Sequence, residues 1–206
     1  MANPTVRSSS RASSGTGTEP TGAAQNDILV AWVSSNSTLP TGPVGWLIDI
    51  DRPWSGATNR MTSWTIKRGA VAPLYVWSSL GTIFSVDIQC VQDADQTTWV
   101  DTAGQSLDNA TSTTPSSPSI ITTSANALVL ACVITAGSPT ITVPSGMAQN
   151  TNSSADGVAT ANVSQAGAGA SGAKQWSLSV TDTTATGTMA IRSAAVVDDL
   201  MPAMMM

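Results

Sequence analysis

Short apolar runs separated by turn residues make up most of the chain from Asp27 onward. Residues 27–34 (DILVAWVS) are almost continuously apolar, which is typical of a strand buried on both faces. Residues 61–67 and 82–91 alternate between apolar and polar with a period of two, which indicates strands with two unlike faces. In residues 82–91 we expect the apolar face to point inward, so that Asp87 and Gln89 face solvent.

The rest of the chain continues this pattern of short strands and frequent turns. We expect additional strands at residues 45–50, 74–77, 127–134, 140–143, 157–164, 175–180 and 188–192. The polar, Pro/Ser/Thr-rich stretch 93–119 is predicted to be a long connection. About ten short strands favour a sandwich or a barrel. The predicted fold class is all-β, a jelly-roll-like antiparallel β-sandwich with an extended N-terminal arm.

The two halves of the chain resemble each other with an offset of about 100 residues. The segment DILVAWV from Asp27 is similar to NALVLACV from Asn126, and Trp77 has a counterpart in Trp176. This repeat predicts that each half supplies strands to both sheets, as in a jelly roll of two Greek keys. A single half would then leave an apolar face exposed. We therefore expect one domain over residues 26–199, with halves at about 26–95 and 119–198.

Both ends of the chain have unusual composition. Residues 1–25 are rich in Ser, Thr and Gly with almost nothing to bury, which predicts an extended arm that becomes ordered against a partner. Residues 200–206 (LMPAMMM) form a Met-rich tail. Such a tail is either frayed or buried against a partner.

Composition excludes several classes of protein. Only 10 % of the 206 residues are charged, the net charge is −5, and the chain has no His. Phosphate contacts need clustered Lys and Arg, so we expect no nucleic-acid binding. No apolar run is long enough to cross a bilayer, and the first twenty residues lack the apolar segment of a secretion signal. We expect synthesis in a reducing cytoplasm and no membrane partner.

Without His the chain lacks the commonest general base and the commonest metal ligand, so we expect no enzyme and no cofactor. Asp49 and Asp51 would point to the same side of a strand and could hold Ca²⁺ with backbone carbonyls. The alternative is a solvated strand end beside Arg52. The other acid pairs are Asp93 with Asp95, at a strand exit where Asp caps turns, and Asp198 with Asp199. No catalytic, cofactor-binding or metal-binding residue is assigned.

Cysteine and tryptophan allow two interpretations each. Cys90 and Cys132 lie in apolar runs, which predicts buried free thiols, with a cross-strand disulfide as the alternative. The chain has seven Trp but one Tyr and one Phe. Trp32, Trp64 and Trp77 are predicted to pack in the core, and a carbohydrate-stacking platform is the alternative.

Four short motifs resemble tailed-bacteriophage virion structural proteins. They are a strand that opens with Asn26-Asp27, the turn Pro43–Trp46 (PVGW), the strand segment Trp64–Ala70 (WTIKRGA) and the turn Pro144–Met147 (PSGM). The chain departs from the usual Pro-Ser-Gly-Trp turn at Val44, which stands where those proteins have Ser.

This resemblance implies a jelly-roll-like virion component without catalytic residues, often a homotrimer. Its partners would be the major capsid protein and copies of itself. The function it implies is that of a capsid decoration, cement or head-fibre protein that binds the outer capsid surface and stabilises the head. The alternative is a minor tail or fibre protein that adsorbs to host glycans. In the first case the protein would be located on the capsid surface of the virion.

Overall fold

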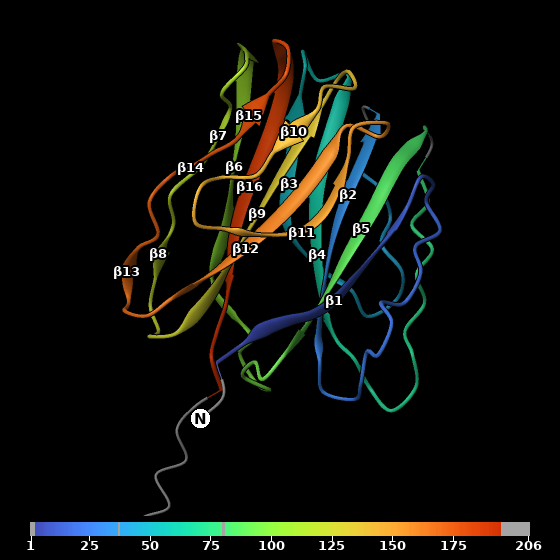
Figure 1. Cartoon of the computed structure of the whole chain (residues 1–206). Helices are drawn as coiled ribbons and strands as arrows, with labels where there is room; N and C mark the ends of the chain where they lie inside the picture. Colours follow the sequence, from blue (N-terminus) through green and yellow to red (C-terminus); the bar gives the residue numbers. More distant parts are fainter. Residues whose placement is uncertain (1–2, 37, 80, 195–206) are drawn as a thin grey trace, which may run out of the picture.

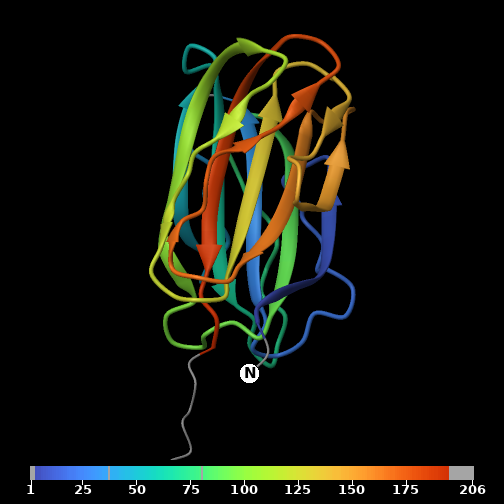
Figure 2. The same cartoon turned by 60° about the vertical axis from the view of Figure 1, so that its left-hand side comes forward.

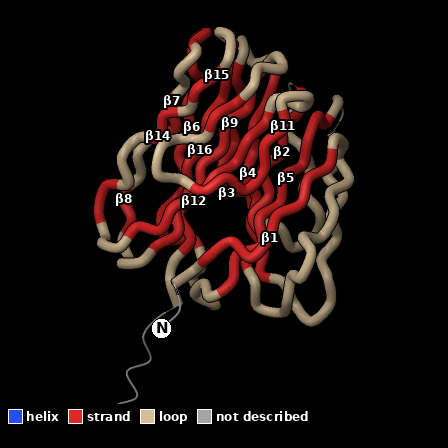
Figure 3. The backbone as a smooth tube through the Cα atoms, viewed as in Figure 1, coloured by secondary structure: helices blue, strands red, loops and turns tan. Residues whose placement is uncertain are grey.

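The computed structural model of the chain describes residues 3–36, 38–79 and 81–194. These residues form strands and loops and no helix (Figure 3). Within these ranges, no helical segment has the length and apolarity needed to cross a lipid bilayer. Asp198, Asp199 and the tail 200–206, for which the sequence suggested an acid pair and a partner contact, lie outside the described residues.

Ten longer strands form two five-stranded antiparallel sheets. In spatial order, the N-sheet contains β1 (Thr5–Ala12), β5 (Ile83–Gln92), β2 (Ile28–Asn36), β4 (Asn59–Lys67) and β3 (Leu47–Trp54). The C-sheet contains β6 (Val100–Ser112), β16 (Asp182–Ile191), β9 (Ala127–Thr135), β12 (Val158–Gln165) and β11 (Ala148–Ser153). The shorter strands are β7 (Ser116–Ser117), β8 (Ile121–Thr122), β10 (Ile141–Thr142), β13 (Gly169–Ala170), β14 (Lys174–Gln175) and β15 (Ser177–Leu178).

The two sheets pack face to face, which confirms the predicted β-sandwich (Figures 1 and 2). The layer between them is formed by side chains from both sheets, including Trp32, Met61, Leu130 and Met189. The outer face of each sheet is also covered, because the loops of the same half fold back over it. The central strands β2 and β9 are consequently buried on both faces, as the run 27–34 predicted.

The internal repeat is visible in the strand order. When the five longer strands of each half are counted along the chain, their spatial order in the sheet is first, fifth, second, fourth and third in both halves. Each half therefore builds one complete sheet, so the expectation that each half supplies strands to both sheets is wrong. The outer face of each half is covered by its own loops, so only the opposite face requires the other half. This strand order does not confirm a jelly roll.

The same turn occurs at equivalent places in the two halves. The backbone N–H of Trp46 donates to the carbonyl of Pro43 at 3.2 Å, and that of Met147 donates to the carbonyl of Pro144 at 3.1 Å. Gly45 and Gly146 have φ angles of 90° and 78°, a region that a side chain disfavours. Two of the motifs that carried the family resemblance are thus one turn used twice.

The predicted arm and the predicted long connection are both wrong. Residues 5–12 are strand β1, paired with β5 along its whole length, and residues 100–112 are strand β6, paired with β16. Both are edge strands, which need not be apolar because one edge has no neighbouring strand. The two repeat units therefore run over about 5–94 and 100–193, here called the N-half and the C-half.

Two other expectations also need correction. The segments 74–77 and 175–180, predicted as strands, cross the outer faces as loops with isolated bridges or two-residue strands. Strand β5 alternates as predicted but in the opposite sense. Its apolar residues Val86, Ile88 and Cys90 pack beneath the outer loops of the N-half. Asp87 and Gln89, expected in solvent, are fully buried.

Candidate functional site

A buried ionic contact joins the two sheets at the edge where β1 lies beside β11. Arg11 of β1 places its Nε 3.6 Å from Oδ1 of Asp87, and its Nη2 contacts Oδ2 of Asp156 in the turn between β11 and β12. Ser9 adds a hydrogen bond of 2.9 Å to the carbonyl of Asn150. Because Arg11 contacts one acid in each half, its ion pairs link the N-sheet to the C-sheet.

Burial sets the protonation behaviour of Asp87. Its side chain has no solvent exposure, and this loss of hydration raises its pKa to about 6. The Thr151 hydroxyl, the Arg11 guanidinium and the Ser85 hydroxyl favour the carboxylate but only partly offset burial. Asp87 is therefore ionised at neutral pH and becomes neutral in mildly acidic solution.

Next to these ion pairs, hydrogen bonds extend towards the centre of the sandwich. The indole N–H of Trp32 donates to Oε1 of Gln89 at 3.0 Å, and Nε2 of Gln89 donates to the Thr160 hydroxyl at 2.9 Å. Gln89 thus links a strand of the N-sheet to one of the C-sheet, and both of its polar ends are satisfied.

The structure separates the two acids suggested for Ca²⁺. The register of β3 shifts between Ile48 and Ile50, so Asp49 and Asp51 lie on opposite faces of the strand. Asp51 accepts two hydrogen bonds from Arg60. Burial raises the pKa of Asp49 to about 6, and the Thr65 hydroxyl opposes this shift.

In the second acid pair, Asp93 with Asp95, the side chain of Asp95 caps a turn. Oδ1 of Asp95 accepts hydrogen bonds from the backbone N–H groups of Thr97 and Thr98, both at 2.8 Å, and these bonds lower the pKa of Asp95. This confirms the prediction that Asp caps a turn at this strand exit. No group of three or more potential metal-ligating side chains occurs among the described residues.

The two cysteines are free and buried, as predicted. Cys90 packs beneath the outer loops of the N-half, whereas Cys132 lies between the sheets. Burial raises the pKa of both thiols, and Cys90 donates to Oδ2 of Asp27 at 3.1 Å. Since the two side chains belong to different layers, the cross-strand disulfide is excluded in this fold.

The tryptophans pack in the core, as predicted. Trp32, Trp64 and Trp77 are each at most 7 % exposed, so none of them offers a ring face to a sugar. Trp77 and its counterpart Trp176 hold the outer loops of their halves against the sheets. The carbohydrate platform suggested for these residues is therefore absent.

Exposed apolar side chains gather on the outer loops of the N-half. We call Val44, Val71, Leu74 and Val76 the apolar loop face; these side chains are 55 % to 88 % exposed. They stand on two segments that lie side by side, since Nε1 of Trp46 donates to the carbonyl of Leu74 at 2.9 Å. Exposed apolar clusters of this kind mark interaction surfaces in soluble proteins.

The C-half provides an internal comparison for this face. Turn and strand pairing place Ser145 at the position of Val44, Ala173 at that of Leu74 and Gln175 at that of Val76. All three are exposed and none is strongly apolar. The fold itself therefore does not require apolar residues at these positions. The one sequence signal for this face was Val44 in place of the usual Ser, whereas the C-half retains a Ser.

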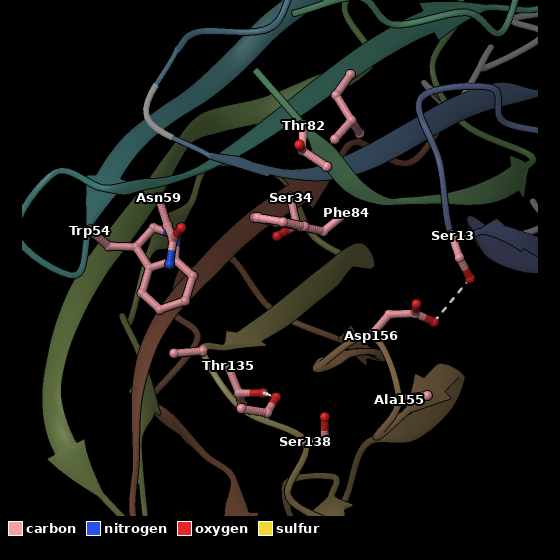
Figure 4. Close-up of a pocket in the computed structure, with 13 residues that line it drawn as sticks. Ser13, Ser34, Trp54, Asn59, Thr82, Phe84, Thr135, Ser138, Ala155 and Asp156 are labelled. Carbon is pink, nitrogen blue, oxygen red and sulfur yellow. Dashed lines mark hydrogen bonds between the residues drawn. The ribbon is translucent and has the colours of Figure 1, made fainter.

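A cleft of about 370 Å³ opens at the end of the sandwich where β2 and β9 finish (Figure 4). Trp54 and Asn59 line it from the β3–β4 hairpin, Phe84 from β5, and Asp156 from the β11–β12 turn. Ser13 donates to Oδ2 of Asp156 at 3.2 Å. No short sequence motif predicts this cleft, because its walls come from segments up to about 140 residues apart.

Comparisons of the chain with protein-family models, with curated proteins and with solved structures find no match.

Proposed function

We propose that the chain is a non-enzymatic structural protein of a tailed-bacteriophage virion that attaches to the outer surface of the head and stabilises it. The observation that carries this proposal is the apolar loop face, present on the N-half and absent from the equivalent surface of the C-half. A protein that binds through the apolar loop face alone can coat a shell without linking shells together.

The rest of the structure is consistent with this role. Among the described residues, apolar side chains are buried on both faces of each sheet. The partner in this proposal is the major capsid protein, and self-association as a homotrimer belongs to the same proposal. Many weak apolar contacts repeated over a shell add up to firm attachment.

The test replaces the apolar loop face with the residues that the C-half carries. A triple variant with Val44→Ser, Leu74→Ala and Val76→Gln should fold normally, because these positions are exposed and the C-half tolerates the same residues. We expect its affinity for purified heads that lack the protein to be at least tenfold lower than that of the native chain. Co-sedimentation with the heads measures both affinity and copy number.

The matched control makes the same kind of change on the C-half. Ile121→Ser and Val180→Ser also remove exposed apolar side chains, and they should leave head binding unchanged. Equal binding by the triple variant and the native chain would refute the assignment of this face. Binding at a dozen copies or fewer per particle would favour a tail location instead.

A further inference from the structure

We propose that the cleft at the end of the sandwich binds a single neutral sugar residue. This inference goes beyond the proposed function and does not depend on it. The volume of about 370 Å³ lies near the lower end of the range of roughly 300–1,000 Å³ for small-molecule sites. It is therefore large enough for one ring of a saccharide.

The polar lining has unused hydrogen-bonding capacity. The side chains of Ser34, Asn59, Thr82 and Ser138 line the cleft, and none makes a hydrogen bond to another described residue. They supply hydroxyl and amide groups that can both donate and accept. Groups of this kind match the hydroxyls of a sugar, each of which also donates and accepts.

Asp156 supplies an oriented acceptor. Its Oδ2 receives the contacts from Arg11, Ser13 and Ser153, which hold the carboxylate in place. Its Oδ1 has no hydrogen bond to the described part of the chain and is open to solvent. A carboxylate oxygen accepts strongly from a hydroxyl group, and a fixed carboxylate loses little freedom on binding. The equivalent position in the N-half is Ala57, so this acceptor is specific to one half.

Phe84 supplies the apolar surface that a sugar ring requires. It is the one Phe in the chain, it is 40 % exposed, and it lines the cleft. Figure 4 shows Trp54 and Asn59 on one side of the cleft, Ser13 and Asp156 on the other, and Phe84 between them. The C–H groups of a sugar can pack on the ring of Phe84 while its hydroxyls reach the polar side chains.

Charge favours a neutral ligand over an acidic one. The acids near the cleft are Asp156 and Asp182, the latter accepting from the backbone N–H of Gly137 at 2.7 Å. Arg11, the cation that contacts Asp156, is already shared between Asp87 and Asp156. An anionic sugar would therefore meet uncompensated negative charge, and we expect it to bind more weakly than its neutral analogue.

Titration of the isolated chain with methyl glycosides of neutral hexoses, monitored by amide and indole NMR signals, tests the inference. We expect at least one glycoside to bind with a Kd of about 1 mM and to shift signals of residues in the cleft. Asn59→Leu or Phe84→Ala should weaken binding at least tenfold, and Thr82→Val should weaken it measurably. Thr5→Val makes the same change at the opposite end of the sandwich and should have no effect.

Three results would overturn the sugar site. They are no binding by any glycoside in the panel, binding that shifts only signals outside the cleft, and binding that Asn59→Leu and Phe84→Ala leave unchanged. Tighter binding of a glucuronide than of the matching glucoside would contradict the charge argument. None of these outcomes affects attachment to heads, because the experiment contains no heads.

Discussion

Replacing Arg11 with Gln is expected to lower the free energy of unfolding by about 3 kcal/mol at pH 7. The change leaves the fully buried Asp87 without its cationic partner and also releases Asp156. An unpaired buried carboxylate is costly because the protein interior solvates charge poorly. Adding Asp87→Asn to Arg11→Gln removes the unpaired charge and should recover most of the loss.

The pH dependence of this loss follows from the pKa of Asp87. In the native chain burial raises that pKa to about 6, from the 3.8 of an ordinary Asp side chain. Between these pH values the folded state holds a proton that the unfolded state has released. The contribution of Asp87 to the free energy of unfolding is therefore fully present below about pH 4. It is lost as the pH rises through about 6. At pH 4.5 Asp87 is neutral in the folded state, so Arg11→Gln should cost much less there than at pH 7.

Chemical denaturation of the native chain and the variants at pH 4.5 and pH 7 measures these differences. Arg60→Gln is the matched control, because Arg60 pairs with the exposed Asp51 and its loss should cost less than about 1 kcal/mol at either pH. An equal loss for Arg11→Gln at both pH values would show that packing of the Arg11 stem, not charge, sets its effect.

Trp32→Ala is the second substitution for which we expect a large effect. It should lower the free energy of unfolding by about 3–5 kcal/mol. Trp32 is fully buried between the sheets and lies against Gly187 of β16. A Cβ atom built on Gly187 would lie 2.7 Å from Cζ3 of Trp32 and 3.0 Å from Cε of Met61. The large side chain of the N-half thus fills the space that the glycine of the C-half leaves.

The reciprocal change identifies this pairing. Gly187→Leu alone overpacks the same space and should cost about 1–3 kcal/mol or more. The double variant Trp32→Ala, Gly187→Leu places the new side chain in the cavity, so its loss should be smaller than the sum of the two single losses. Thermal or denaturant unfolding of the four proteins measures the coupling. Strictly additive losses would mean that the two positions do not share space.

The central strands were predictable because their sequence is apolar on both faces. Residues 27–34 and 127–134 have few arrangements open to them other than burial under two layers. The edge strands β1 and β6 were not predicted, because a sequence rich in Ser and Thr is as compatible with an exposed edge strand as with a loop. Their membership of the sheets follows from the pairing of each with the fifth strand of its half, which no local pattern encodes.

The direction of burial was the part least accessible to the sequence. Alternation in β5 was correctly identified, but an alternating strand in a sheet covered on both faces has no solvent side. Asp87 could be buried because Arg11 reaches it from β1, and those residues are 76 positions apart. Among the candidate surfaces, only Val44 carried a local signal, since it replaces a Ser in an otherwise recognisable turn.

Hydroxyl-radical footprinting of the chain bound to purified heads tests the central claim most directly. The claim is that the two halves share one fold and that the chain binds heads through the apolar loop face of the N-half. On binding, labelling of Val44, Val71, Leu74 and Val76 should fall several-fold, while labelling of exposed apolar residues of the C-half, such as Ile121, should stay constant. Protection of the C-half surface with continued labelling of the apolar loop face would contradict the account.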